Sequence, residues 1–202
     1  DSPLKSLQDL KGKKVGVSGA ESLTDWLAKQ LTLKQGWGPD GIIIAPIGSN
    51  PTTSAAAFRT TTVDAYVGGT ATFLRMAESQ SGRILAPVSS YMGPLAAGML
   101  FASKRAMDNH PDGVRAFVAG WIETIAYIRA HKDEAVKHAA ALTNFSEGVM
   151  SRDYDIVVGM YTKDCRFDAR SLETLRQSFV DLKLLDEAPD MTKLYTEAYL
   201  PK

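Results

Sequence analysis

The segment that most constrains this chain is residues 13–35, where a short apolar run precedes small polar residues and a helical pattern. Val15-Gly16-Val17 predicts a strand, and a leucine-faced helix is predicted from Ser22, its N-cap, to about Lys34. Between them, Ser18-Gly19-Ala20-Glu21 would let a ligand approach the backbone closely. The unpaired N–H groups and positive dipole of a helix start favour an anionic or strongly polar group. The segment therefore predicts a ligand-binding α/β lobe.

The rest of the first half also alternates predicted strands and helices. Strands are expected at 41–45, 63–67 and 83–87, and helices at 52–60 and from Gly68-Gly69-Thr70 to about residue 79. The run at 41–45 is continuously apolar, which is typical of a strand covered on both faces of a sheet. Strands separated by helices indicate βαβ units and a mainly parallel sheet.

The second half has a different pattern, turn-rich near residues 89–94 and helical from Pro111 onward. Helices are expected at 111–128, 132–142, 146–161 and from 168 or 171 to 182, with a short amphipathic piece at 191–200. The first of these has an apolar stripe at i, i+3, i+4, i+7 spacing, made of Val114, Phe117, Val118, Trp121, Ile122, Ile125 and Ile128. Such a stripe needs a sheet to cover, and the second half contains almost no predicted strand.

Composition limits the classes of function. The 23 basic and 23 acidic side chains cancel, and the charges before and after Pro111 are +3 and −3. This imbalance is too mild to indicate a nucleic-acid partner or a polybasic membrane face. No apolar run is long enough to span a bilayer. The single Cys165 cannot form an internal disulfide, and it leaves the cellular compartment undecided.

The order of motifs resembles the periplasmic substrate-binding proteins of ABC importers, in the nitrate, sulfonate and taurine branch that includes thiamine-pyrimidine binders. The resemblance rests on residues 10–17 with the small-residue loop after them, Val63-Asp64-Ala65, Asn109-His110-Pro111 before a long helix, and the run 190–196. It covers nearly the whole chain. One departure is Thr60-Thr61-Thr62, where relatives usually place a glycine before the aspartate strand.

The resemblance implies a type II periplasmic-binding-protein-like α/β fold with one complete α/β lobe and a helical remainder of the other lobe. Residues 1–92 would form lobe two with the ligand-binding loops. Residues 93–202 would form the hinge return and the helical C-terminal part of lobe one. Family members have a preceding segment that builds most of lobe one. We therefore expect residues 1–202 to be a fragment, or another chain to supply the missing sheet.

The same resemblance, together with the loop chemistry, predicts the site. Ser18, Gly19, Ala20 and Ser22 would hold a ligand group, and Gly69 and Thr70 would meet it from the same edge of the sheet. Tyr91 would either lie over the ligand or pack the hinge. The ligand would be a small polar or anionic solute of the sulfonate, nitrate, carboxylate or pyrimidine type, delivered to an ABC transporter permease in the bacterial periplasm. Neither a cofactor nor a metal is expected.

Other function classes stay open as alternatives. Gly16-Val17-Ser18-Gly19-Ala20 differs from a G-x-S-x-G nucleophile elbow at one position, and Asp64 and His110 follow in hydrolase order. An enzyme on the same fold, a small-molecule lyase or a relative of the thiamine-pyrimidine synthases, is a second alternative. The cysteine-rich iron motif of those synthases is missing here. A ligand-sensing domain is a third. His131, Glu134 and His138 have too few neighbouring ligands to favour a metal site.

Overall fold

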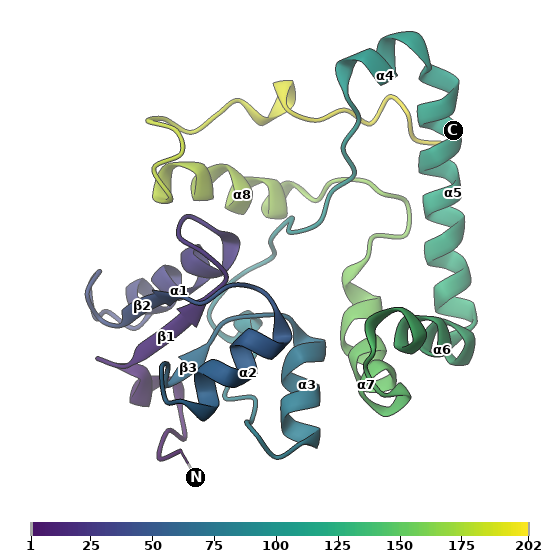
Figure 1. The fold of residues 1–202 in the computed structure, drawn as a ribbon. Helices are drawn as coiled ribbons and strands as arrows, with labels where there is room; N and C mark the ends of the chain where they lie inside the picture. Colours follow the sequence, from purple (N-terminus) through teal and green to yellow (C-terminus); the bar gives the residue numbers. More distant parts are fainter. Residues whose placement is uncertain (1, 202) are drawn as a thin grey trace. The chain divides into compact units, whose positions relative to one another are not determined.

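The computed structural model describes residues 2–201, and in it the chain divides into two compact units, Asp1–Gly93 and Pro94–Lys202 (Figure 1). The predicted division lay one residue earlier, after residue 92. The assignment of these units to lobes two and one stays a prediction.

Unit 1 is an α/β unit, as the sequence predicts. Its elements are η1 (Leu7–Leu10), β1 (Lys14–Val17), α1 (Leu23–Lys34), β2 (Ile43–Pro46), α2 (Pro51–Arg59), β3 (Ala65–Tyr66), α3 (Thr70–Glu78) and η2 (Val88–Ser90). The three strands form a parallel sheet in the order β2-β1-β3, so that β1 lies in the middle. The α/β fold class is therefore confirmed.

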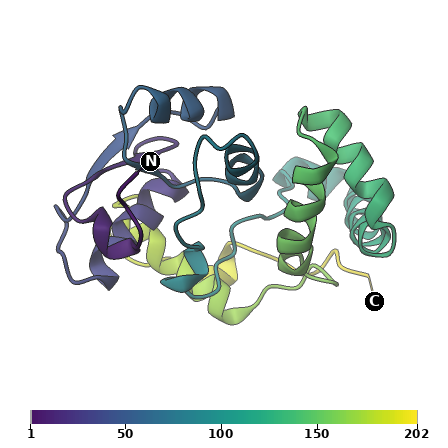
Figure 2. The same ribbon diagram turned by 90° about the horizontal axis from the view of Figure 1, so that it is seen from below.

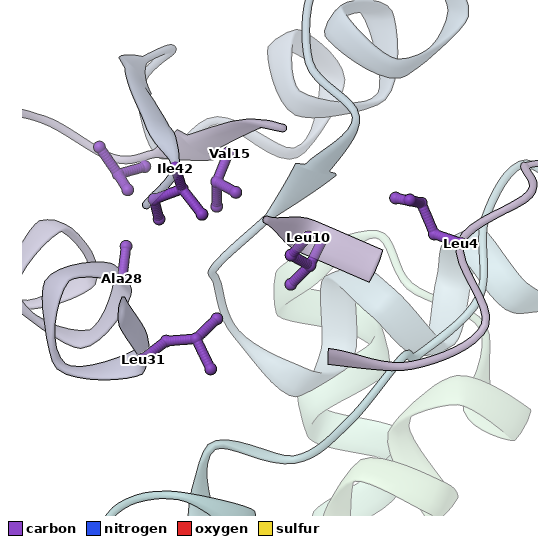
Figure 3. Packing of buried hydrophobic residues seen from close by; sticks show 7 residues of the cluster. Leu4, Leu10, Val15, Ala28, Leu31 and Ile42 are labelled. Atoms are coloured by element: carbon purple, nitrogen blue, oxygen red, sulfur yellow. The ribbon is translucent and has the colours of Figure 1, made fainter. Parts of the chain in front are cut away.

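The alternation of side chains along β1 sets the two faces of this sheet. Val15 and Val17 are 1% and 0% exposed and belong to a cluster with Ala28 and Leu31 of α1 (Figure 3). Because neighbouring side chains on a strand point to opposite faces, Gly16 lies on the other face. A Cβ added there would lie 3.0 Å from the Tyr66 ring. Helix α1 therefore covers one face of the sheet.

The other face is covered by α2 and α3, on the opposite side of the sheet from α1 (Figures 1 and 2). The strand order accounts for this placement. The chain moves from β1 to β2 in one direction and then back past β1 to β3, and right-handed crossovers in opposite directions lie on opposite faces. The Tyr66 and Phe73 rings meet on this face with their centroids 5.9 Å apart.

Two strand predictions in unit 1 need correction. The strand expected at 83–87 does not form, since this segment has no ladder partner. Its Leu85 instead packs against the α1-side cluster. The strand expected at 41–45 forms as β2, but as an edge strand of the sheet. Ile42 is buried, whereas Ile43 is 56% exposed, so the apolar run did not mark a strand covered on both faces.

Unit 2 is helical. It contains α4 (Lys104–Asn109), α5 (Pro111–Ala130), α6 (Lys132–Thr143), α7 (Glu147–Val157), η3 (Val158–Met160), α8 (Ala169–Asp181) and η4 (Met191–Lys193). Ser146 is an N-cap whose side chain accepts a backbone N–H bond, as predicted, and of the two expected starts of the last helix, 168 and 171, it is Asp168 that caps α8. Helix α4 was not predicted. The amphipathic piece expected at 191–200 is reduced to η4.

The apolar stripe of α5, which we call the α5 face, is partly open to solvent. Ile125 is buried, but Phe117 and Trp121 are 61% and 38% exposed, and their rings stack with centroids 6.5 Å apart. Exposed aromatic pairs are costly in water and commonly mark a contact surface. The expectation that a sheet outside this unit covers the stripe stays a prediction.

Thr61, in the Thr60-Thr61-Thr62 departure, has a φ of 52°, a left-handed conformation that suits glycine and strains a β-branched residue. Thr61→Gly should therefore raise the free energy of unfolding, by about 1 kcal/mol, because relief of strain outweighs the greater entropy of the unfolded chain. Urea denaturation measures this change. Thr62→Gly is the matched control and should lower the stability. A loss of stability in Thr61→Gly would contradict the prediction.

Candidate functional site

The structure brings two of the predicted site loops to one edge of the unit 1 sheet. Ser18, Gly19, Ala20 and Ser22 follow β1, and Gly69 and Thr70 follow β3. Strands β1 and β3 are parallel neighbours, so both loops leave from their carboxyl ends. The helices after these strands, α1 and α3, lie on opposite faces of the sheet (Figures 1 and 2). This is the topological switch point at which open α/β sheets commonly bind ligands.

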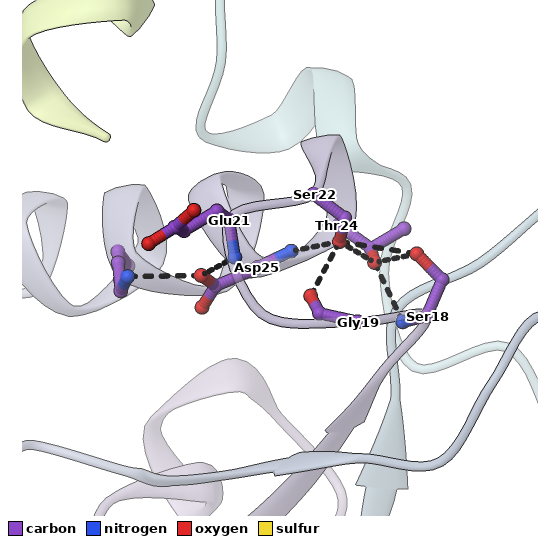
Figure 4. Close-up of polar contacts among 7 residues, drawn as sticks. Ser18, Gly19, Glu21, Ser22, Thr24 and Asp25 are labelled. Atoms are coloured by element: carbon purple, nitrogen blue, oxygen red, sulfur yellow. Dashed lines mark hydrogen bonds and ion pairs between the residues drawn. The ribbon is translucent and has the colours of Figure 1, made fainter. Parts of the chain in front are cut away.

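A cluster of three hydroxyl groups stabilises the loop after β1 (Figure 4). Ser18 Oγ lies 3.0 Å from Ser22 Oγ and 2.8 Å from Thr24 Oγ1, and the last two oxygens are 3.0 Å apart. The Ser18 backbone N–H donates to Thr24 Oγ1 at 2.8 Å. The loop is therefore held in shape by its own side chains before any ligand arrives.

The hydrogen bonds of Ser22 determine which of these hydroxyl protons can turn toward a ligand. Ser22 Oγ donates to the Gly19 carbonyl at 2.7 Å, since a carbonyl oxygen can only accept, and it accepts from the Asp25 N–H. Its other acceptor position is taken by Ser18 Oγ, which donates to it. The Thr24 hydroxyl then donates to Ser18 Oγ or turns toward a ligand. The cluster thus keeps one movable proton at the sheet edge.

A buried carboxylate fixes the far side of the same loop. Asp25 is 3% exposed, and its Oδ2 accepts the Glu21 N–H at 2.8 Å and the Lys29 ammonium at 2.9 Å (Figure 4). Glu21 has a φ of 59°, which is unfavourable for a residue with a Cβ. The Asp25 bond offsets part of this strain. The Glu21 side chain is exposed, in line with the expectation that it points to solvent.

Backbone N–H groups on both loops at this edge have no hydrogen-bond acceptor among the described residues. Within the part of the chain that the structure describes, the Gly19 and Ala20 N–H groups have no hydrogen-bond acceptor. Helix α3 begins after Gly69 with no side-chain cap, so its first N–H groups, from Thr70 onward, are also unpaired. The two helix starts differ, because Ser22 caps α1. Unpaired N–H groups and two dipole ends suit acceptor-rich, negatively charged groups.

Tyr91 is half-buried. It follows η2 and packs against the cluster that contains Val15 and Leu31. Burial raises the pKa of its phenol to about 12. Packing, one of its two expected roles, is therefore observed, and its contact with a ligand stays a prediction.

The hydrolase alternative does not agree with this geometry. Asp64 precedes β3 and accepts the Lys14 N–H at 2.9 Å, at the start of β1. Ser18 follows the opposite end of β1, so the two side chains lie at opposite edges of a parallel sheet. The polar contacts of the Ser18 hydroxyl are with Ser22 and Thr24, and neither is a base.

Metal and membrane chemistry find no support among residues 2–201. No group of three His, Cys, Asp or Glu side chains described there could hold a metal ion. The His131 ring stacks on the Tyr127 ring, and His138 Nε2 lies 3.6 Å from Glu134 Oε1. None of the described helices combines the length and apolar character needed to cross a bilayer.

A hollow of about 580 Å³ lies elsewhere, in unit 2, and sequence patterns did not indicate it. It is open to solvent and lined by Arg115, Ala116, Ala119, Tyr199, Leu200 and Pro201. The Arg115 guanidinium already donates to the Ala198 carbonyl at 2.5 Å and lies over the Tyr199 ring. This hollow therefore offers little free polar chemistry.

Three residues that shape the sheet edge were missed in the sequence: Thr24, Asp25 and Tyr66. Thr24 and Asp25 follow the N-cap Ser22 by two and three residues, positions that face back toward a loop, and this spacing was an available signal. Tyr66 ends β3 and precedes Gly68-Gly69. No local pattern indicates where its ring lies.

A family-model comparison matches residues 1–135 to the family described as "NMT1/THI5 like". A search among curated proteins gives no match.

Solved structures with the same fold include two sulfonate-binding proteins and one enzyme. The alkanesulfonate-binding protein SsuA of Xanthomonas axonopodis pv. citri, bound to MOPS, has a TM-score of 0.69 at 18% identity, covering 94% of this chain and 63% of its own. The periplasmic aliphatic sulphonate-binding protein SsuA of Escherichia coli has a TM-score of 0.71 at 18% identity, with 96% and 65% covered. The desulfurization enzyme DszB has a TM-score of 0.66 at 17% identity, with 98% and 72% covered. The chain thus spans just under two thirds of the two binding proteins.

Asp25→Ala should lower the free energy of unfolding by about 1–3 kcal/mol, because the Glu21 N–H loses its acceptor and the left-handed turn loses its support. Asp25→Asn retains an acceptor oxygen and should lose less. Lys29→Ala removes only the half-exposed partner and should cost at most about 1 kcal/mol. Glu21→Gly should restore part of the stability of Asp25→Ala, as measured by urea denaturation. Equal losses in Asp25→Ala with and without Glu21→Gly would contradict this role.

Proposed function

Since this chain belongs to the NMT1/THI5-like family, we propose that it binds a small, acceptor-rich solute and releases it unchanged. The family match and the fold shared with SsuA support a solute-binding role. The ligand would sit at the carboxyl edge of the unit 1 sheet, at the loops after β1 and β3.

The observation that carries this proposal is the pair of loops at the β1–β3 switch point. There, the Gly19 and Ala20 N–H groups are unpaired among the described residues, and α3 begins without a side-chain cap. A sulfonate or carboxylate presents several acceptor oxygens to such donors. The movable Thr24 proton adds a further donor, and the Thr70 hydroxyl lies at the start of α3. Tyr91 would complete the site only if its ring also reaches the ligand.

Sulfonates are the favoured solute class within this proposal. Two structural neighbours are named as sulfonate-binding proteins, and one of them holds MOPS, itself a sulfonate. Nitrate, carboxylates and pyrimidines remain in the set to be tested. The oxygens of a sulfonate would receive the fixed N–H donors without any proton transfer or covalent step.

Within the same proposal, the bound solute would be handed to an ABC importer permease in the bacterial periplasm. Closure of a second lobe over the ligand would form the shape that the permease recognises. Genes for a permease and an ATPase beside the gene for this chain would support import. A neighbouring signalling domain would favour the ligand-sensor alternative.

The enzyme alternative has one observation in its favour, the fold shared with DszB. The lone thiol of this chain argues against cysteine catalysis, because burial raises the pKa of Cys165 and so disfavours the reactive thiolate. Turnover of an arylsulfinate, the ligand class in a DszB complex, would overturn the non-enzyme proposal.

The proposal also assigns an occupant to the α5 face. In the working protein it would be covered by the sheet of a lobe-one segment or chain outside residues 1–202. The exposed Phe117 and Trp121 support this, as does the share of the SsuA chains that has no counterpart here.

Calorimetry with butanesulfonate, taurine, nitrate, benzoate and a hydroxymethylpyrimidine tests the site in the full protein. Ser18→Ala and Thr70→Ala should each weaken binding by about 1 kcal/mol or more if those hydroxyls are paired to ligand. Ser18→Ala combined with Thr24→Val should lose more than either alone, because no movable proton remains. Ser81→Ala, beyond the other end of α3, is the matched control and should bind normally. Unchanged affinity in both single variants would remove this site assignment.

Phe117→Glu tests the covering of the α5 face. In residues 1–202 alone the change should alter the free energy of unfolding by no more than about 0.5 kcal/mol, because Phe117 is exposed. In the full protein it should cost about 3 kcal/mol or more, since it would bury a charge at a packed surface. Glu123→Ala, on the polar side of α5, should cost little in both forms. Equal costs of Phe117→Glu in the two forms would show that nothing covers this face.

A further inference from the structure

Tyr66 lies at the carboxyl edge of the unit 1 sheet, where its side chain meets β1 and the loops after β2 and β3. It is the last residue of β3, and the half-buried ring lies on the Gly16 face of the sheet. Its contacts involve Gly16 within β1 and the loops after β2 and β3.

The ring occupies a slot that exists because two neighbouring residues are glycines. A Cβ at Gly16 would lie 3.0 Å from Tyr66 Cδ2, and a Cβ at Gly68 would collide with Cε1 on the other edge of the ring. Neither glycine has a positive φ, so the demand is for space and not for backbone freedom. The Phe73 ring of α3 meets Tyr66 edge-on and holds it from a third direction.

The hydroxyl of the same residue reaches the remaining loop. Tyr66 Oη donates to the Gly48 carbonyl at 3.2 Å, in the loop between β2 and α2. That loop is also joined to β1 by the Ile47 N–H, which donates to the Val17 carbonyl at 2.9 Å. The Tyr66 side chain therefore connects the end of β1, the loop after β2 and the start of α3.

We infer that Tyr66 is a positioning residue, which fixes β1, the loop after β2 and the loop after β3 relative to one another through its ring and its hydroxyl. The inference deepens the proposed function and rests on it for its consequence in binding. The slot also accounts for small residues at positions 16 and 68, where a methyl group would displace the ring.

Tyr66→Phe separates the hydroxyl from the ring. Loss of the bond to the Gly48 carbonyl should weaken butanesulfonate binding roughly two- to tenfold in the full protein. Backbone NMR relaxation of the free protein should show increased motion at Gly48 and Ser49. Tyr195→Phe removes a hydroxyl from a tyrosine of unit 2, and it is the matched control that should change neither quantity.

A double-mutant cycle tests the slot. Gly68→Ala should lower the midpoint of thermal unfolding and weaken butanesulfonate binding, because the new methyl group displaces the ring. In a Tyr66→Ala background the same substitution should have a much smaller effect on both. Equal effects in the two backgrounds, or unchanged NMR relaxation and affinity in Tyr66→Phe, would overturn the inference. If wild-type protein bound no member of the panel, the proposed function would fail, while the relaxation and unfolding data would still decide the role of Tyr66.

Discussion

The alternation of side chains along the central strand β1 is the constraint on which unit 1 depends. Val15 and Val17 must face α1, where they are almost completely buried, and this leaves Gly16 on the opposite face together with the exposed Lys14. A larger residue at position 16 would clash with Ile47 and Tyr66. The strand thus anchors the core on one side and leaves room for an aromatic ring on the other. Since β1 is central, its carboxyl end lies beside that of β3, and the two loops meet there.

The starts of α1 and α3 differ in capping, and this difference decides which backbone N–H groups a solute could reach. At α1, Ser22 and the Asp25 carboxylate satisfy nearby N–H groups and hold the loop in a single shape. At α3, Gly69 contributes no side-chain cap, so the first N–H groups stay available. A solute would therefore meet a rigid, partly satisfied loop on one side and open donors on the other. Rigid donors bind without the entropy cost of ordering a loop.

Periodicity and capping residues predicted the elements well, because those signals are local. Ser22 and Ser146 cap helices where expected, and α5 follows its apolar spacing. The segment 83–87 failed as a strand because strand formation needs a neighbour, which no local pattern reveals. Likewise the loop residues of the site were predicted from their position after strands. Thr24 and Tyr66 were missed, because hydroxyl contacts and ring placement depend on the packed structure.

The two units differ in how many of their apolar side chains are buried. Unit 1 assembles one continuous cluster from η1, β1, α1 and the start of β2, so the loops at its sheet edge rest on a formed core. In unit 2 the twenty-residue α5 buries only Ile125 among the described residues of that helix. A helix with so little buried surface gains little from packing and depends on whatever meets its open face. The proposed solute site therefore rests on the core of unit 1, whereas α5 is the part of the helical unit that a further surface would stabilise.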